Sequence, residues 1–248
     1  MDERFKRTEM LLGRSGAARL ENSRVLLFGL GGVGSAAFEA LCRAGVGRLD
    51  IVDGDEVALS NINRQLIALS STVGMRKTAA AAARGRDINP AADIREFDMF
   101  VTAENIDAFD FSQYGFVLDA IDTVASKLLI AEECAASGTP LISCMGTGGK
   151  LRPELLRTGD IFETSGCPLA RVMRKELRRR NIRSMRVVWS PEEPNAPETD
   201  DCEMKGRAPV PGTVSFVPPT AGYIMASEAV LYLSGKGGNV KNTVIMDK

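Results

Sequence analysis

The sequence contains no histidine among its 248 residues. This absence excludes a Ser-His-Asp triad, a Cys-His pair, a histidine general base, and zinc or haem held by histidine. Any chemistry must therefore use carboxylates, cations, thiols or groups of the substrate. The 31 Lys and Arg residues nearly balance the 32 Asp and Glu residues, and 44% of the residues are hydrophobic, which is the composition of an ordinary globular protein.

Cysteine is scarce, and long apolar runs are missing. The five cysteines are widely spaced and form no C-x-x-C pair, so we expect no structural zinc. Cys42, Cys134 and Cys144 have apolar neighbours, which indicates buried thiols in a reducing compartment. No uncharged apolar run approaches the roughly 20 residues that span a bilayer, and the charged N-terminus has no apolar signal core. The sequence thus predicts a cytoplasmic protein with no membrane partner.

Short apolar runs alternate with helical patterns over the first 150 residues. The apolar runs, which have the length of buried strands, are 25–28, 49–52, 94–97, 116–119 and 140–143. Helical patterns cover 35–44, 77–86 and 127–137, and short helical pieces precede them over 4–20. This alternation predicts a Rossmann-like, doubly wound α/β fold with a largely parallel sheet.

The chain changes character after residue 150, but no linker divides it into independent domains. We expect one domain over 1–248, with an N-terminal helical segment (1–24), a core (25–150) and a C-terminal α/β extension (151–248). The extension begins with a basic segment. A Pro-, Gly- and acid-rich stretch over 190–212 predicts an exposed, mobile loop. A helix over about 220–233 and an edge strand over 241–246 are predicted to follow.

The first apolar run leads directly into a glycine-rich loop that opens a helix. The loop has the pattern G-x-G-G-x-G, with Gly29, Gly31, Gly32 and Gly34. A strand, such a loop and a helix in this order place backbone N–H groups around an anion. Asp53, at the end of the second strand, is positioned to accept hydrogen bonds from ribose hydroxyls. The pattern predicts a nucleotide site, and by itself it does not distinguish NAD from ATP.

Charged residues downstream of the loop favour ATP. Hydride transfer has no use for several cations beyond the pyrophosphate, whereas phosphoryl or nucleotidyl transfer needs them to neutralise the charge that develops on the leaving group. Arg64 and Lys77 fit this role. Asp122, which follows the 116–119 strand, is suited to hold Mg²⁺ on the phosphates.

Five motifs across residues 29–122, in order GLGGVG, VDGDEV, SNINRQ, GMRK and DAIDT, resemble the adenylation domain of ubiquitin-activating-type enzymes. The resemblance implies that Asp53 and Asp55 belong to the ATP site, with Asp53 on the ribose. It further implies that Asp122 coordinates Mg²⁺ and that the enzyme is a homodimer in which Arg7 acts in trans. The residues that it places around the phosphates are Asn61, Arg64, Gln65 and Lys77.

Within this superfamily, the chain most resembles the tRNA threonylcarbamoyladenosine dehydratases. The opening segment RFKRTEMLLG, the segment CPLA before the basic run, and the later segments VVWS and SFVPP carry this resemblance. It implies ATP-dependent dehydration and cyclisation of threonylcarbamoyladenosine in tRNA through an acyl-adenylate, with release of AMP and pyrophosphate. An intramolecular nucleophile makes an enzyme thioester unnecessary, which suits a chain without histidine.

The segment 171–186 is strongly basic and supports a tRNA partner, because clustered cations track phosphates whatever the net charge of the chain. The candidate tRNA-binding residues are Arg171, Arg174, Lys175, Arg178, Arg179, Arg180 and Arg183. A solvated helix face with no RNA role is the alternative that composition leaves open.

The sequence is also compatible with three different functions. Adenylation of a ubiquitin-like sulfur-carrier protein is the main one, although its enzymes commonly hold zinc with C-x-x-C pairs. An NAD-dependent oxidoreductase and a non-catalytic nucleotide- or RNA-binding module are the remaining two, and a sulfur-relay protein is a further candidate partner. Cys167 and Cys202, in loop-like surroundings, are candidate nucleophiles or exposed or structural thiols. The cluster 146–149 is either a close approach to the adenylate or a flexible turn.

Overall fold

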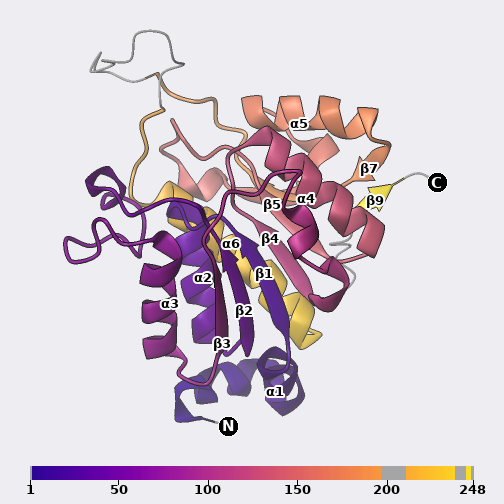
Figure 1. Ribbon diagram of the computed structural model, residues 1–248. Coiled ribbons are helices and arrows are strands. Elements are labelled where there is room, and N and C mark those ends of the chain that lie inside the picture. Colours follow the sequence, from indigo (N-terminus) through magenta and orange to yellow (C-terminus); the bar gives the residue numbers. More distant parts are fainter. Residues whose placement is uncertain (1, 197–210, 238–243, 247–248) are drawn as a thin grey trace.

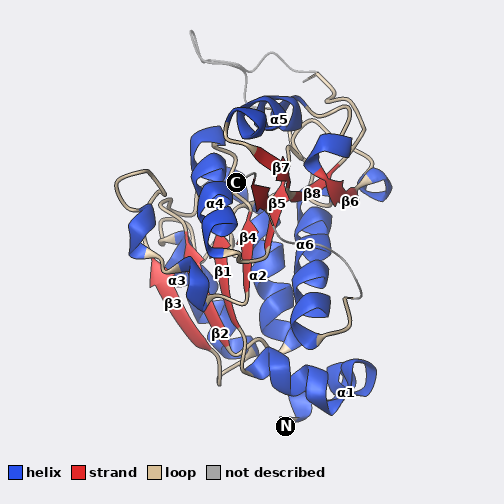
Figure 2. Cartoon of the chain, turned by 90° about the vertical axis from the view of Figure 1, so that its right-hand side faces the viewer, coloured by secondary structure: helices blue, strands red, loops and turns tan. Residues whose placement is uncertain are grey.

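A seven-stranded sheet organises the chain in the order β3-β2-β1-β4-β5-β8-β6 (Figures 1 and 2). The computed structural model describes residues 2–196, 211–237 and 244–246. The strands of this sheet are β1 (Arg24–Phe28), β2 (Arg48–Val52), β3 (Asp93–Phe97), β4 (Phe116–Asp119), β5 (Leu141–Cys144), β6 (Arg157–Asp160) and β8 (Arg186–Trp189). Neighbouring strands are parallel except β6, which pairs antiparallel with β8. The predicted fold class is confirmed.

Helices cover both faces of the sheet (Figure 2). They are α1 (Lys6–Glu21), α2 (Gly32–Ala44), α3 (Lys77–Ile88), α4 (Val124–Ser137), α5 (Pro168–Arg179) and α6 (Val217–Ser234). Successive side chains of a strand point to opposite faces, so Leu27 packs in the core with α2, α3 and α6, while Leu26 packs in the core with α4 and α5. Helices α6 and α2 approach closely at Gly222, where a Cβ would lie 2.1 Å from the Val33 carbonyl oxygen of α2.

An ionic cluster joins α2 to α3. Arg84 of α3 and Arg43 of α2 both pair with the carboxylate of Glu39, whose side chain is 9% exposed. Burial alone would raise the pKa of Glu39, but the hydrogen bonds from the two arginines outweigh it and hold that pKa below its ordinary value. The cluster therefore stabilises the fold only while Glu39 is ionised.

The strand order reverses between β1 and β4, and in open α/β sheets a crevice forms outside the carboxyl ends of two such strands. From β1 the chain builds outward to β2 and β3, then returns to the other side of β1 to form β4 and β5. Loops that leave two such strands diverge to opposite faces, and in open α/β sheets ligands bind where this occurs. The glycine loop leaves β1 at this point.

The ends of the chain differ in part from the predictions. Helix α6 begins at Val217, three residues before the predicted start, because a proline in the first turn gives up only an N–H that has no helical partner. The predicted strand 241–246 lies partly outside the described residues, and its described part is the short strand β9 (Ile245–Met246), which pairs with β7 (Ile182–Ser184). Strands β6, β7 and β8 were not predicted. The N-terminal helical pieces meet at Gly13, whose φ is 76°.

The predicted exposure of the 190–212 segment is wrong at its start, and the predicted mobility stays a prediction. Ser190 is fully buried, and the Glu192 carboxylate accepts hydrogen bonds from the backbone N–H groups of Leu151 and Arg152, at 2.9 and 3.0 Å. Residues 197–210 lie outside the described part of the chain. Among the described residues, no helix is both long and apolar enough to cross a membrane.

The cysteines expected to be buried are buried. Cys42 and Cys134 are 0% exposed and Cys144 is 3% exposed. Burial raises the pKa of Cys42 and of Cys144 to about 12, so neither is a thiolate near neutral pH. Cys167 was expected in loop-like surroundings, but it is the N-cap residue of α5 and 3% exposed. Cys202 lies outside the described residues.

Candidate active site

The loop from Gly29 to Gly34 follows β1 and lies beside the carboxyl ends of β2 and β4. Gly29 has a φ of 86° and donates its N–H to the Val52 carbonyl at the end of β2, at 2.8 Å. A Cβ on Gly29 would lie 2.8 Å from the Ala120 carbonyl oxygen after β4, and one on Gly34 would lie 1.8 Å from the Gly29 carbonyl oxygen. Only glycine fits either position, so the tight turn that the sequence predicts is present.

The start of α2 is open for an anion. Gly31 is the N-cap residue of α2, and glycine has no side chain that could accept from the N–H groups of the first turn. The first turn of a helix leaves these N–H groups without helical partners. A Cβ on Gly31 would meet no atom within 4 Å, so the space above it holds none of the described residues. Gly32 is close-packed, because its Cβ would lie 2.9 Å from the Pro218 Cβ. These N–H groups and the helix dipole favour a phosphate here.

Asp53, Asp55 and Lys77 lie beside the loop. The Asp53 carboxylate accepts hydrogen bonds from the backbone N–H groups of Leu30, at 2.7 Å, and of Asp55, at 2.9 Å. Lys77, which begins α3 and is 6% exposed, places its Nζ 2.7 Å from Asp55 Oδ2 and 3.7 Å from Asp53 Oδ1. A lysine is rarely so buried unless its charge is paired. The structure thus brings a buried cation to the edge of the glycine loop.

Arg64 packs on the glycine loop. Its Cγ would lie 3.2 Å from a Cβ on Gly32, and its guanidinium donates to the Ser60 carbonyl, at 3.1 Å, and to Asn63 Oδ1, at 2.9 Å. Both acceptors are neutral, and they belong to the turn that carries Arg64. In these contacts no carboxylate pairs with the guanidinium, so its charge is available to an anion at the start of α2.

Asn61 and Gln65 lie on the same turn, with different surroundings. The Asn61 side-chain oxygen accepts from the Ala58 N–H, at 3.1 Å, and so closes the turn. Gln65 is 5% exposed, and its Oε1 has no hydrogen-bond partner among the described residues. The next residue, Leu66, donates its N–H to Ser35 Oγ in the first turn of α2, at 3.1 Å. A buried acceptor without a partner is costly, so Gln65 is suited to meet a bound molecule.

Asp122 is exposed at the carboxyl end of the sheet. It comes two residues after Ala120, whose carbonyl faces Gly29, and so it lies at the edge of the same crevice. Its carboxylate accepts a long hydrogen bond from the Thr123 hydroxyl, at 3.4 Å. Within the described ranges, no three carboxylate or thiol side chains are grouped to hold a metal ion. One exposed carboxylate beside phosphates nevertheless suits Mg²⁺, which is usually held by one or two carboxylates and the substrate's phosphates.

Arg7 lies far from the glycine loop of its own chain. A Cβ on Gly45, the residue that ends α2, would touch the Phe5 ring at 3.3 Å. The glycine loop lies at the other end of α2, which has 13 residues and is therefore about 20 Å long. Arg7, two residues after Phe5, is exposed at the amino end of the strands. The other predicted nucleotide residues meet at the carboxyl end, and Arg7 does not join them.

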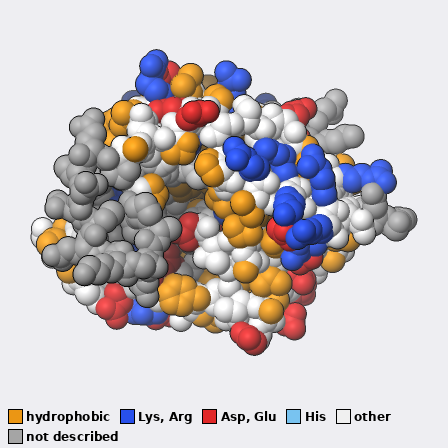
Figure 3. Space-filling model, turned by 90° about the horizontal axis from the view of Figure 1, so that it is seen from above, with side chains coloured by type: hydrophobic (Ala, Val, Ile, Leu, Met, Phe, Trp, Pro, Cys, Tyr) orange, Lys and Arg blue, Asp and Glu red, His pale blue; other side chains and the backbone are white. Residues whose placement is uncertain are grey.

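The predicted tRNA-binding residues lie on α5 and the chain that follows it. Figure 3 shows Lys and Arg side chains gathered over one part of the face on which α5 lies in Figure 1. Some of these cations have partners: Arg174 bonds to Thr164, and Arg179 and Arg180 pair with Glu176. Those that are exposed are Arg171, Lys175, Arg178, Arg179 and Arg183.

A buried polar network, which the sequence did not predict, lies at the carboxyl ends of β4 and β5. Lys127 of α4 is fully buried and places its Nζ 2.9 Å from Asp119 Oδ2, 3.0 Å from Ser143 Oγ and 2.8 Å from the Cys144 carbonyl oxygen. The other Asp119 oxygen accepts from the Ile121 N–H, at 3.1 Å. The network fixes the ends of β4 and β5. Its only local signal is a lysine on the apolar face of a predicted helix.

A second buried lysine, Lys150, which the sequence did not predict, directly follows the glycine cluster 146–149. Lys150 is 2% exposed and donates from Nζ to the carbonyls of Ser190 and Glu192. Burial lowers the pKa of Lys150, while the nearby Cys167 and Glu192 oppose this shift. Gly149, with a φ of 69°, donates its N–H to the Gly212 carbonyl, and its own carbonyl accepts from the Asn195 N–H. The cluster therefore lets the described ends of the 190–212 segment approach closely.

The fold and the site together define a nucleotide-binding α/β protein. A glycine loop and two cations, Arg64 and Lys77, lie at the crevice between β1 and β4. Comparison with known proteins makes this specific: residues 5–247 match the ThiF family, and the chain belongs to that family.

Proteins similar to this chain over nearly its whole length include tRNA threonylcarbamoyladenosine dehydratases. A tRNA threonylcarbamoyladenosine dehydratase from Bacillus subtilis is 38% identical over 242 residues, which are 94% of this chain and 95% of the relative. The structure also resembles that of the E. coli tRNA N6-threonylcarbamoyladenosine dehydratase, TcdA. In complex with ATP, that enzyme gives a TM-score of 0.86 at 30% identity over 96% of this chain and 97% of that one. Its complex with AMP gives 0.86 at 32% identity, over 96% of each chain.

Proposed function

We propose that this chain is an ATP-dependent tRNA threonylcarbamoyladenosine dehydratase. The observation that carries the proposal is the buried Lys77 beside the glycine loop, a cation that an adenylating enzyme needs and a dehydrogenase does not. The similarity to dehydratases over nearly the full length of both chains supports it, because it extends through the C-terminal extension as well as the nucleotide core.

The nucleotide would lie along the crevice. Asp53 accepts from the ribose, and the N–H groups at the start of α2 meet the phosphates, with Arg64 and Lys77 neutralising them. Lys77 pairs with Asp55 in this structure, and its flexible side chain can exchange that carboxylate for a phosphate oxygen. Gln65 Oε1 would find in the bound nucleotide a hydroxyl donor that the described residues do not supply. Asn61 acts indirectly, by closing the turn that carries Arg64.

The reaction proceeds in two steps. The threonyl carboxylate of the modified adenosine attacks the α-phosphorus of ATP, and pyrophosphate leaves. A neighbouring atom of the same side chain then attacks the activated carbonyl, a ring closes and AMP leaves with the former carboxylate oxygen. The net change is loss of one water from the nucleoside and conversion of ATP to AMP and pyrophosphate. The protein contributes orientation and charge neutralisation, and no thiol or histidine takes part.

Asp122 is the residue proposed to hold Mg²⁺ on the phosphates. The fit is that of a single exposed carboxylate at the edge of the crevice, two residues beyond the Ala120 carbonyl that faces Gly29. The ion would neutralise charge on the departing pyrophosphate, which adds to what Arg64 and Lys77 provide. Asp122→Asn should therefore raise the Mg²⁺ concentration at which activity is half-maximal, while Mg²⁺-free nucleotide still binds.

A homodimer would complete the site with Arg7 of a second copy. The support is that Arg7 is exposed at the amino end of the sheet, about one length of α2 from the glycine loop of its own chain. The same helix also offers an apolar surface to another copy, since Met10 and Leu11 are 79% and 84% exposed. A sulfur-relay partner stays a prediction from the family resemblance.

The basic residues of α5 are proposed to contact tRNA phosphates. Exposure of Arg171, Lys175 and Arg179 supports this proposal.

Residues 1–248 are proposed to form one adenylation domain. The support is that β8 and β6 come from the segment after residue 150 and extend the same sheet as β1 and β5.

Pyrophosphate release with different carboxylate substrates tests the function. We expect release to rise when tRNA carrying threonylcarbamoyladenosine is added, and to stay at background with unmodified tRNA of the same sequence. Stimulation by a sulfur carrier with a C-terminal diglycine, and none by modified tRNA, would replace the proposal with carrier adenylation. No release with any substrate would favour a non-catalytic module or a dehydrogenase.

A further inference from the structure

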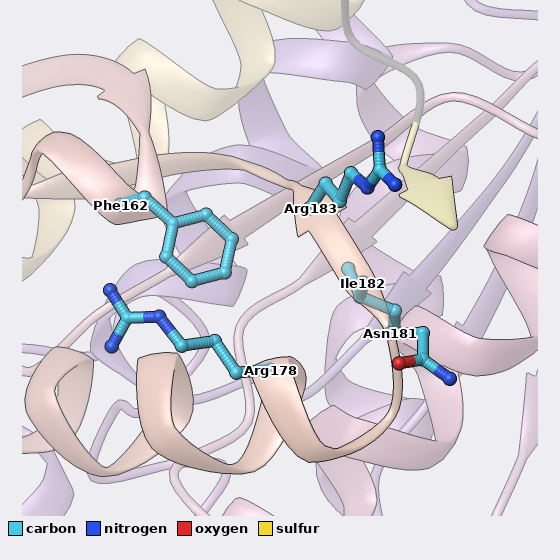
Figure 4. A pocket seen from close by; sticks show the side chains of 5 residues that line it. All are labelled: Phe162, Arg178, Asn181, Ile182 and Arg183. Atoms are coloured by element: carbon cyan, nitrogen blue, oxygen red, sulfur yellow. The ribbon is translucent and has the colours of Figure 1, made fainter. Parts of the chain in front are cut away.

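A pocket outside the nucleotide crevice lies at the C-terminal end of α5. It has a volume of about 360 Å³ and is lined by Phe162, Arg178, Asn181, Ile182 and Arg183. Figure 4 shows these side chains, with Phe162 on one segment and the others on the last turn of α5 and the chain after it. The volume falls in the range of small-molecule sites in proteins.

Two elements fix the pocket wall. Phe162 lies on a short helical turn, Ile161–Glu163, which Asp160 caps by accepting from the Phe162 N–H at 2.8 Å. The opposite wall turns out of α5 at Asn181, whose φ is 57°, a left-handed conformation that asparagine tolerates better than most residues. The pocket is thus built by the folded backbone rather than by side chains alone.

Phe162 and Arg178 form a flat, charged platform. The Arg178 guanidinium carbon lies 5.1 Å from the centre of the Phe162 ring. The ring is only half-buried, and Arg178 is exposed. Unpaired nucleobases stack on aromatic rings and on guanidinium planes, and this is how proteins bind the single-stranded parts of RNA. An exposed guanidinium over a half-buried ring therefore brings two groups on which a base can stack to one place.

The surroundings of the platform favour a polyanion over an acidic side chain or a small molecule. Exposed cations precede the pocket along α5 and follow it at Arg183, while Glu176 is the only acidic residue of the helix. The N-terminal end of α5 lies at the carboxyl end of β5, the strand next to β4, because Cys167 Sγ would be 3.7 Å from a Cβ on Gly146, which follows β5. The helix, about 18 Å long, thus leads from the carboxyl end of β5 to the pocket.

We propose that this pocket binds one unpaired nucleotide of the tRNA, separate from the modified adenosine, with its base stacked on Phe162 and its phosphate on Arg178. Arg183 also lines the pocket. The inference rests on the proposed function for its choice of RNA. It goes beyond that function by assigning a second RNA contact that distinguishes an RNA with unpaired bases from a plain duplex.

Phe162→Leu tests the stacking contact, with Phe162→Tyr as the variant that keeps the ring. Binding of the full-length protein to modified tRNA, and to a blunt RNA duplex of matched length, is measured over a range of salt concentrations. We expect Phe162→Leu to weaken tRNA binding about tenfold, with an unchanged dependence on salt and unchanged duplex binding, because stacking contributes to affinity without releasing counterions. Phe162→Tyr should bind tRNA as the unchanged protein does.

Arg178→Gln tests the phosphate contact against Arg48→Gln, an exposed arginine at the amino end of β2. We expect Arg178→Gln to weaken binding to tRNA and to reduce the slope of log K against log salt by about one, and Arg48→Gln to change neither. ATP affinity and the melting temperature, measured for every variant, separate a local effect from loss of the fold.

Two results would overturn the inference: equal tRNA affinity for Phe162→Leu and the unchanged protein, or an equal loss of duplex binding. The latter would leave a phosphate track with no stacked base. Water loss from the nucleoside, measured on the unchanged protein, tests the proposed function separately, so either proposal can fail while the other stands.

Discussion

Gly31→Ala separates the space that a nucleotide would fill from the space that the protein itself packs. A Cβ on Gly31 meets nothing within 4 Å, and its φ of −67° lies outside the left-handed region that favours glycine. We therefore expect the free energy of unfolding to change by less than about 1 kcal/mol, which for a chain of this size is a shift of less than about 4 °C in Tm.

The effect of the same methyl group on ATP binding should be much larger. If the triphosphate lies against the first turn of α2, the added Cβ overlaps it, and overpacking of this kind costs about 1–3 kcal/mol. That range corresponds to a Kd for ATP raised roughly 5- to 150-fold. Isothermal titration calorimetry measures the Kd, and a thermal melt without ligand measures the stability.

Gly34→Ala is the matched control within the same loop. Its Cβ would lie 1.8 Å from the Gly29 carbonyl oxygen, a backbone atom that cannot move aside. We expect a loss of more than about 2 kcal/mol of stability, with ATP binding lost as a consequence. Gly31→Ala with unchanged ATP affinity would refute the reasoning, because the phosphates would then lie elsewhere. Equal loss of stability in both variants would also refute it.

Four charged side chains give further predictions. Arg7→Ala and Lys77→Ala should each be inactive, yet an equal mixture should regain roughly a quarter of the activity, since half of the dimers are mixed and each has one complete site; a mixture that stays inactive after subunit exchange contradicts action in trans. Lys127→Met should cost about 3–5 kcal/mol in chemical denaturation, because it leaves Asp119 buried without its cation, and a loss under about 1 kcal/mol would contradict this. Glu39 has a folded-state pKa below its unfolded value, so its contribution to stability is present above pH of about 4.3 and is lost as the pH falls through the folded value. Glu39→Gln should accordingly be less stable at pH 7, with a difference that shrinks in acid melts; a constant difference would argue against the ion pairs.

Local patterns predicted the nucleotide core well, because its elements are defined by their own residues. The predicted strand 25–28 differs by one residue from β1, and 116–119 has the same bounds as β4. Both strands are buried on both faces and therefore appear in the sequence as continuous apolar runs. The glycine loop could be predicted for the same reason, since its glycines are required by backbone contacts within the loop and with the adjoining strand ends.

Elements that depend on distant partners were missed. β6 has the sequence Arg157-Thr158-Gly159-Asp160, which has no apolar pattern, and it is a strand because β8 pairs with it. β8 is apolar, but it directly follows the basic segment, which dominates the pattern there. Lys127 and Lys150 look like ordinary surface lysines in the sequence, and only the fold shows that each is buried. No local signal gives their partners, which lie 8 to 42 residues away along the chain.

Mass spectrometry of nucleosides tests the central claim most directly. Modified tRNA is incubated with the full-length protein, ATP and Mg²⁺, then digested and analysed beside a reaction without ATP. We predict that threonylcarbamoyladenosine loses the mass of one water, only with ATP, and with one AMP formed for each nucleoside converted. An unchanged nucleoside while the same sample turns ATP into AMP and pyrophosphate would contradict the account.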